Sequence, residues 1–383
     1  MVTGCSDDGG GDDSSGDRTT TTASGGEASG DVGEAEGEGG EARDVPGDEW
    51  ETVDPAEVGL DAAKLEELAA EAEADGSNCF LVVRDGKVAG EWYWNGTNES
   101  SAQEVFSATK SLTSVLVGVA VTDGEVDVSE SASTWITQWA GTPAEEVTVE
   151  NLLSNDSGRE WSFAIDYQQL VRSPDMTGFA IGLDQPDPPG VTWAYNNSAI
   201  QTLEQVIEGS LDMPMADAAE ERIFAPLGMD DSSLKTDPSG NGMAFMGLQS
   251  TCRDMARFGL LVLDDGAWGD EEIVSSDYID AATAQPSQEL NAGYGYLFWL
   301  NRKGQLAGAT SPATAEQAEE RPDSQIVPGA PEDLVWAIGL GSQIVQVHEP
   351  TDTVVVRLGP GDIGSAYSTA ETARVVTEAV TDE

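Results

Sequence analysis

The sequence of 383 residues holds one histidine, three cysteines and five lysines, and it contains no run of 18 apolar residues. One histidine excludes a zinc site built on several histidines, and any Ser-His-Asp triad would have to pass through His348. The cysteines match no metal-ligand spacing and are too few for a disulfide scaffold, so Cys79 and Cys252 are expected to be buried thiols. Without a long apolar run, we expect no transmembrane span.

Basic residues are also scarce: 17 Lys and Arg face 71 Asp and Glu, which gives a formal net charge of -54. A nucleic-acid-binding surface needs clustered basic side chains, so we expect no nucleic-acid partner. Residues 1–49 hold 14 acidic and two basic residues, so most of the negative charge belongs to the rest of the chain. This distribution is typical of proteins from high-salt organisms; an ordinary acidic protein is the alternative.

Large apolar side chains are almost absent from residues 1–49, which are rich in Gly, Ser, Thr, Asp and Glu. We predict a disordered acidic spacer there and a folded domain over 50–383. The start, Met-Val-Thr-Gly-Cys5-Ser, resembles the end of a lipoprotein signal without its apolar segment, so either the start codon is assigned too late or Cys5 is incidental. Lipid attachment at Cys5 and an extracytoplasmic, cell-surface or secreted location are the expectation, with a cytoplasmic location as the alternative.

The hydrophobic pattern predicts an α+β fold. A hairpin is indicated around Asp85-Gly86, and further strands fall near the C-terminus. The predicted strands are 80–83, 87–94, 294–300, 334–338, 342–348 and 353–358; the predicted helices are 61–74, 105–120, 203–211, 254–263 and 366–379; the predicted loops are 151–158 and 302–333. We therefore expect an antiparallel sheet of about five strands from both chain ends, flanked by helices, with a mostly helical domain inserted at about 120–290.

Ser107-Ala-Thr-Lys110 lies where a helical pattern begins. Residues at i and i+3 share a helix face, so the Ser107 hydroxyl and the Lys110 amine can meet. Lys110 could then act as the base that a serine nucleophile needs, provided that burial keeps its amine neutral. Ser232-Ser-Leu-Lys235 has the same spacing, but the turn residues that follow it favour a surface or turn lysine.

Two further elements stand downstream. Tyr195-Asn196-Asn197 follows a Pro-Pro-Gly segment, and residues 339–343 read Gly-Leu-Gly-Ser-Gln within the strand region. Glycines on a strand permit close approach of another backbone or a ligand, and a bulge is the alternative. His348, at a strand end before Glu349-Pro350, is expected to be structural or on the surface.

At this point the chain resembles the serine β-lactamase and penicillin-binding-protein superfamily. The matching segments follow the family's order over about residues 50–380: the nucleophile helix 105–114, the loop 152–158, Pro189-Gly190 with Tyr195-Asn196-Asn197, and the segments 224–230 and 248–259. The most similar branch is that of the class C β-lactamase-related hydrolases, which includes family VIII carboxylesterases and 6-aminohexanoate-dimer hydrolases. The resemblance implies an α/β sandwich and a serine hydrolase that needs no metal or cofactor.

The resemblance also implies roles for individual residues. Ser107 would be the acylated nucleophile, Lys110 the general base, and Tyr195 the group that shuttles protons and keeps Lys110 neutral. The oxyanion hole would be formed by the backbone N–H of Ser107 and that of Leu340. In the alternative alignment of the last motif, the second backbone N–H would be that of Ser342. On the substrate side we place Tyr167, Asn197, Gly341 and Ser342; a core aromatic residue is the favoured alternative for Tyr167.

The sequence departs from the family pattern in two places. Ala337-Ile338-Gly339 stands where penicillin-recognising enzymes have Lys-Thr-Gly or His-Thr-Gly, and Asn155 replaces a frequent loop histidine. The cation that would pair with a substrate carboxylate is missing, which argues against antibiotic hydrolysis and peptidase activity and favours an ester or a plain amide. The expected partner is a small-molecule ester, amide or short peptide-like substrate. A β-lactamase, a D-alanyl-D-alanine carboxypeptidase-type enzyme and a non-catalytic binding module remain the alternatives.

The net charge generates a first prediction. Self-repulsion on this scale destabilises a compact state, and molar salt screens charges beyond about 3 Å. We expect far-UV circular dichroism to show unfolding when the salt concentration falls below roughly 1 M. Full secondary structure in dilute buffer would contradict the high-salt interpretation.

Overall fold

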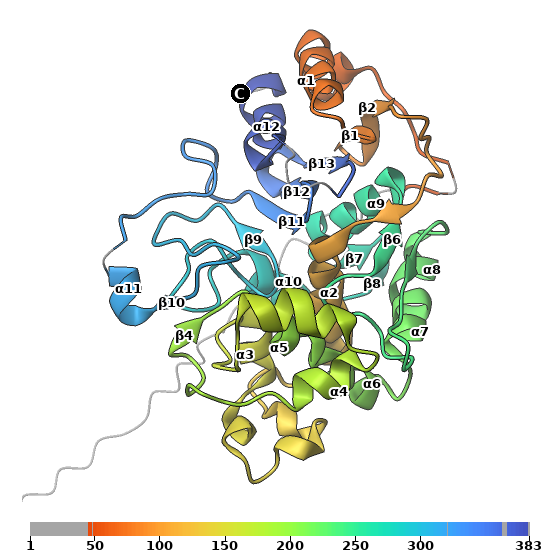
Figure 1. Ribbon diagram of the computed structural model, residues 1–383. Helices are drawn as coiled ribbons and strands as arrows, with labels where there is room; N and C mark the ends of the chain where they lie inside the picture. Colours follow the sequence, from red (N-terminus) through yellow and green to blue (C-terminus); the bar gives the residue numbers. More distant parts are fainter. Residues whose placement is uncertain (1–44, 48, 320, 362–365, 382–383) are drawn as a thin grey trace, which may run out of the picture. The chain divides into compact units, whose positions relative to one another are not determined.

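The computed structural model describes residues 45–47, 49–319, 321–361 and 366–381 (Figure 1). By its contacts the chain divides into two units, Met1–Glu41 and Ala42–Glu383, and every described residue belongs to the second. The predicted spacer thus lies almost wholly outside the described residues, and so does Cys5. Pro46 and Gly47, at the end of the predicted spacer, are part of the second unit, where Arg257 donates to their carbonyls at 2.8 and 2.5 Å.

A six-stranded antiparallel sheet forms the centre of this unit, in the order β2-β1-β13-β12-β11-β9. The strands are β1 (Cys79–Arg84), β2 (Lys87–Tyr93), β9 (Trp299–Leu300), β11 (Val335–Gly339), β12 (Gln343–His348) and β13 (Thr353–Leu358). This confirms the predicted sheet built from both chain ends. It has one strand more than the predicted number of about five.

Alternating side chains bury both faces of the sheet. In β1, Phe80 and Val82 pack on one face with α1 (Ala62–Ala74), and Leu81 and Val83 pack on the other. The first face is also covered by α12 (Thr369–Arg374), which continues as a π-helix over Val375–Ala379. The second face is covered by α9 (Cys252–Leu263) and α2 (Thr109–Thr122) (Figure 1). Strands buried on both sides explain the near-continuous apolar runs in β1 and β13.

The predicted helical region lies between β3 and α10 (Figure 1). Its helices are α3 (Val149–Ser154), α4 (Met176–Ile181), α5 (Asn197–Gln201), α6 (Leu203–Leu211), α7 (Met215–Ala219), α8 (Ala225–Leu227) and α10 (Ser276–Thr283). The small strands are β3 (Gln103–Glu104), β5 (Ser233–Leu234) and β6 (Leu248–Ser250), which form one sheet, and β7 (Ala267–Trp268) with β8 (Glu271–Glu272), which form another. None of the described helices is both long and apolar enough to cross a membrane.

Two predicted loops differ from the structure. The segment 151–158 begins inside α3, whose N-terminus is closed by reciprocal hydrogen bonds between Thr148 and Asn151. Its Asn and Ser residues favour a loop in the sequence, whereas in the structure Asn151 closes the N-terminus of a short buried helix and Asn155 is its C-cap. The segment 302–333 is mostly irregular, but it carries β10 (Ala313–Thr314) and α11 (Ala315–Glu319), and β10 pairs with β4 (Thr192–Trp193) just before Tyr195.

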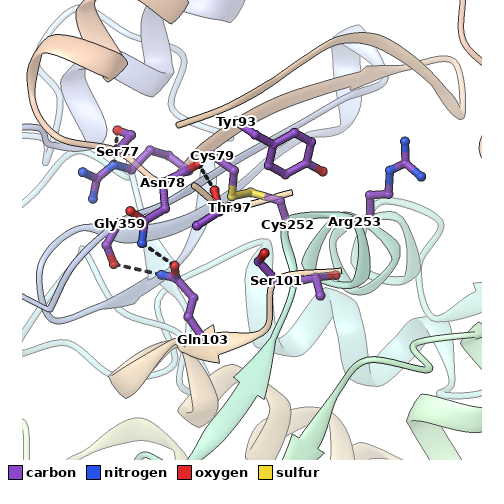
Figure 2. Close-up of a disulfide and its surroundings, with 12 residues drawn as sticks. Ser77, Asn78, Cys79, Tyr93, Thr97, Ser101, Gln103, Cys252, Arg253 and Gly359 are labelled. Carbon is purple, nitrogen blue, oxygen red and sulfur yellow. Dashed lines mark hydrogen bonds between the residues drawn. A yellow bond between two sulfur atoms is a disulfide. The ribbon is translucent and has the colours of Figure 1, made fainter. Parts of the chain in front are cut away.

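The prediction that Cys79 and Cys252 are separate thiols was wrong, because the structure joins them in a disulfide (Figure 2). Cys79 is the first residue of β1 and Cys252 the first of α9, 173 positions apart in the sequence. The pairing depends on α9 packing against the sheet beside the start of β1, which cysteine spacing does not reveal.

The disulfide generates a second prediction. A cross-link that closes so long a loop removes entropy from the unfolded chain, so Cys252→Ser should lower the free energy of unfolding by about 2–5 kcal/mol. Chemical denaturation followed by circular dichroism measures the change, and Cys5→Ser serves as the control. Thiol titration of the denatured protein should find one thiol before reduction and three after it; three before reduction would contradict the pairing.

Candidate active site

Ser107 lies at the sharp entry into the central helix α2. It is the middle residue of a 3-10 turn, Phe106–Ala108, that runs directly into α2. Phe106 has a positive φ of 49°, a conformation that non-glycine residues rarely adopt, and the Thr109 hydroxyl donates to its carbonyl at 2.6 Å. The turn presents Ser107 one helical turn before Lys110, as the spacing predicted.

Lys110 is held beside the serine in an apolar environment. Its Nζ lies 2.8 Å from Ser107 Oγ and 3.0 Å from the carbonyl oxygen of Phe245, and the residue is 1 % exposed. No described carboxylate forms an ion pair with it. Burial lowers the pKa of Lys110 to about 7, against the opposing charge of Asp166. Near neutral pH a large share of the amine is therefore neutral and able to accept a proton.

Tyr195 completes the group that the sequence singled out. It lies between β4 and α5, and its ring centroid is 4.6 Å from Lys110 Nζ. The side chains of Ser107 and Trp299 are near enough to its hydroxyl to lower the pKa of the phenol, against the larger effect of burial. The ring stacks on Trp299 with centroids 5.5 Å apart. Burial raises the pKa of Tyr195, so its phenol stays protonated at neutral pH and can pass a proton but does not act as a free anionic base.

Asp166, which the sequence analysis missed, anchors the tyrosine loop. This buried carboxylate accepts the backbone N–H of Asn197 at 2.6 Å, that of Ser198 at 3.3 Å and the Ser198 hydroxyl at 2.7 Å. Burial raises its pKa to about 6, while the charge of Lys110 opposes that shift. No motif marks Asp166, and the only signal is an acidic residue within an aromatic segment.

Two residues predicted on the substrate side lie near this loop. Tyr167 is half-buried, and Asn197 is buried. The Asn197 side chain is near enough to the Tyr167 hydroxyl to lower its pKa, against the larger effect of burial. The Tyr167 ring also stacks on Phe163 at a centroid distance of 4.8 Å, and Phe163 is 54 % exposed. Tyr167 is thus neither a core aromatic residue nor a direct neighbour of the Ser107 hydroxyl among the contacts described.

The end of β11 approaches the nucleophile from the sheet. A Cβ on Gly339 would come within 2.0 Å of the Val105 carbonyl oxygen, so glycine permits the backbone to pack against the residue two before Ser107. Leu340 follows on the turn with its side chain 44 % exposed. Gly341 and Ser342 complete the turn with positive φ, and the Ser342 hydroxyl donates to the Tyr367 carbonyl at 2.6 Å, which occupies it away from the substrate side.

Other residues singled out lie elsewhere. His348 is buried, with its ring nitrogens hydrogen-bonded to Thr351 and Asp333, which is the expected structural role. Lys235 of the second Ser-x-x-Lys is half-exposed and pairs with Glu104 at 3.2 Å. In the described part of the chain, no group of three or more His, Cys, Asp or Glu side chains is arranged to hold a metal ion.

Comparison with known proteins decides the family. The model of the Beta-lactamase family matches residues 64–364. The chain belongs to the beta-lactamase family. It is a serine hydrolase of this family, and the predicted relationship to 6-aminohexanoate-dimer hydrolases is confirmed.

Individual relatives agree with this assignment. The 6-aminohexanoate-dimer hydrolase of Paenarthrobacter ureafaciens is 24% identical over 313 residues, which cover 71% of this chain and 78% of that protein. Penicillin-binding protein 4* of Bacillus subtilis is 26% identical over 142 residues, 35% of this chain and 31% of its own. A provisionally named 6-aminohexanoate-dimer hydrolase from Bacillus anthracis superposes with a TM-score of 0.63 at 22% identity, over 82% of this chain and 79% of that one.

A provisionally named β-lactamase from Bacteroides dorei also has this fold. It superposes with a TM-score of 0.65 at 18% identity, and the match covers 84% of this chain and 100% of that chain. At this level of identity the likeness shows the fold alone. It agrees with the expected α+β architecture of sheet, flanking helices and helical insertion.

The state of Lys110 generates a third prediction. Only the neutral amine accepts a proton, so kcat/KM for p-nitrophenyl butyrate should rise about tenfold per pH unit below the lysine's pKa of about 7 and level off above it. Asp166→Asn should move this acid limb to lower pH, because the Asp166 charge raises the pKa of Lys110. Lys235→Gln, the control, should leave the profile unchanged, and a profile without an acid limb near neutral pH would contradict the assignment.

Proposed function

We propose that the protein hydrolyses an ester or a linear amide through an acyl-enzyme on Ser107, with Lys110 as the general base and Tyr195 as the proton relay. The observation that carries this proposal is the Lys110 Nζ, which lies 2.8 Å from Ser107 Oγ in a buried site where its pKa falls to about 7. An amine in this state can take the serine proton as the hydroxyl attacks.

The reaction runs in two halves. Neutral Lys110 takes the proton of Ser107 as Oγ bonds to the carbonyl carbon, and the N–H groups of Ser107 and Leu340 stabilise the oxyanion. The proton then passes from Lys110, through the phenol of Tyr195, to the leaving alcohol or amine as the acyl-enzyme forms. Water next attacks the acyl carbon, gives its proton to Lys110, and releases the acid while Ser107 regains its hydrogen.

The surroundings of the site favour a substrate without a carboxylate next to the scissile bond. At the position of the missing cationic triplet, Ala337 is buried and Ile338 packs against the core. Exposed apolar side chains instead stand on two elements of the site, Phe163 beside Tyr167 and Leu340 on the turn after β11. The match to a 6-aminohexanoate-dimer hydrolase supports a linear amide alongside simple esters.

The setting of the enzyme is part of the same proposal. Disulfides form and persist mainly in oxidising compartments, so the one between Cys79 and Cys252 supports an extracytoplasmic location. Lipid attachment at Cys5 would tether the domain through the acidic segment that follows it. The net charge of -54 supports function at high salt.

A fourth prediction tests the nucleophile. In about 3 M KCl, chosen to screen the surface charge, the wild-type chain should react with a fluorophosphonate probe and turn over p-nitrophenyl butyrate. Ser107→Ala should abolish both, because it removes the hydroxyl that lies 2.8 Å from the Lys110 amine. Ser232→Ala, which alters the second Ser-x-x-Lys, is the matched control and should keep both. Folded wild type that neither reacts nor turns over substrate would favour a binding module.

The same assay separates the substrate classes. Hydrolysis of the linear 6-aminohexanoate dimer or of esters, with no turnover of a β-lactam or a D-alanyl-D-alanine peptide, is the expected result. Turnover of the β-lactam or of the D-alanyl-D-alanine peptide, whose carboxylate lies close to the scissile bond, would overturn the argument from Ala337 and Ile338.

A further inference from the structure

The turn between β11 and β12 is held from inside the protein by buried side chains. Gln343, the first residue of β12, is fully buried. Its Nε2 donates to the carbonyls of Leu340 at 3.0 Å, Gly341 at 3.4 Å and Gly359 at 2.9 Å, and its Oε1 accepts the Gly359 N–H at 2.9 Å. One amide thus fixes two carbonyls of the turn and ties them to the end of β13.

A second buried side chain holds the other side of the same turn. Arg357 Nη1 donates to the carbonyl of Gly341 at 2.6 Å and to that of Ser342 at 2.9 Å. Every carbonyl from Leu340 to Ser342 therefore accepts a hydrogen bond from a buried side chain. Each planar peptide group joins a carbonyl to the N–H of the next residue, so these bonds fix the N–H groups of Gly341, Ser342 and Gln343. Leu340 is held between this fixed turn and Gly339, whose backbone pairs with Gln343 in the sheet.

The network continues to the nucleophile. Gln103 Nε2 donates to Gln343 Oε1 at 2.9 Å and to the Gly359 carbonyl at 2.8 Å, while its Oε1 accepts from Asn78 at 2.7 Å. Figure 2 shows the hydrogen bonds of Gln103 to Asn78 and to Gly359, in the surroundings of the Cys79–Cys252 disulfide. Gln103 lies in β3, four residues before Ser107. A chain of amides thus links the strand before the nucleophile to the turn after β11.

We propose that Gln343 is a positioning residue that sets the Leu340 N–H at the distance from Ser107 that oxyanion stabilisation requires. The inference rests on the proposed acyl-enzyme function and adds the residue that holds the second half of the oxyanion hole in place. Gln343 touches no substrate; it acts through the backbone of the turn and through Gln103. An oxyanion donor placed wrongly acts mainly on kcat, because its hydrogen bond strengthens only in the transition state.

Gln346 provides a matched control on the same strand. It is also fully buried and also uses both ends of its amide, since it accepts from Trp336 Nε1 at 2.9 Å and donates to the Thr372 carbonyl at 3.2 Å. Three positions along a strand reverse the side-chain direction, so Gln346 lies on the α12 face, away from the turn. Gln343→Leu and Gln346→Leu therefore both remove hydrogen bonds of a fully buried amide, on opposite faces of the sheet, with more bonds lost at Gln343.

The experiment compares both variants with the full-length wild type in about 3 M KCl. We expect Gln343→Leu to lower kcat for p-nitrophenyl butyrate by about 10–100-fold, with KM changed by less than about threefold. The acid limb set by Lys110 should stay at the same pH, because the lysine's surroundings are untouched. Gln346→Leu should lower the melting temperature while keeping kcat within about twofold of the wild-type value.

Each outcome bears on the proposal. Wild-type kcat in folded Gln343→Leu, or an equal fall of kcat in both variants, would overturn it. If Gln343→Leu fails to fold, the test uses Gln103→Leu, which removes a less buried amide of the same network. This variant should lower kcat by about tenfold, and an unchanged kcat would also overturn the proposal. Ser107→Ala distinguishes failure of the proposed function from failure of the positioning role. Turnover that survives in Ser107→Ala refutes the proposed function. Loss of turnover in Ser107→Ala together with wild-type kcat in Gln343→Leu refutes only the positioning role.

Discussion

The removal of Lys110 from water is the constraint on which the rest of the site depends. An ammonium ion surrounded by an apolar core is costly, and the protein meets this cost by letting the amine become neutral rather than by supplying a carboxylate ligand. The nearest ligands of Nζ are a hydroxyl and a carbonyl oxygen, which suit either protonation state. The carboxylate of Asp166 accepts a hydrogen bond from the loop after Tyr195, and its negative charge partly offsets the lowering of the Lys110 pKa by burial.

This constraint explains why the central helix is so thoroughly enclosed. Residues Thr109 to Ala120 of α2 are buried all around, which an ordinary amphipathic helix would not be. The helical insertion covers one side through α6, α10 adds another, and the end of β11 packs close to the helix entry through Gly339. Polar residues within α2 find specific partners there: Thr113 donates to the Ala244 carbonyl at 2.6 Å and Ser111 to the Leu297 carbonyl at 2.9 Å.

The sequence predicted those features of the molecule that depend on residues close together on one helix or hairpin. The hairpin around Asp85-Gly86, the limits of α6 and the meeting of Ser107 with Lys110 follow from alternation, periodicity and spacing on one element. The disulfide, Asp166 and Gln343 could not be found in that way. Each acts on a residue far away in the sequence, at Cys252, Asn197 and Gly359 respectively, and only the assembled fold brings these partners together.

The order of the strands has a consequence for biosynthesis. β1 is made well before one of its two neighbours, β13, which follows it in the chain at Thr353–Leu358. Until β13 has been made, the apolar strand Cys79–Arg84 therefore has an open edge, which is a ready template for pairing with other chains. The same edge must stay free for β13, so it cannot be protected permanently. Repulsion between the negative charges of nascent chains keeps other chains away from this edge without blocking its pairing with β13. The many acidic residues therefore have a second use, before the enzyme has folded.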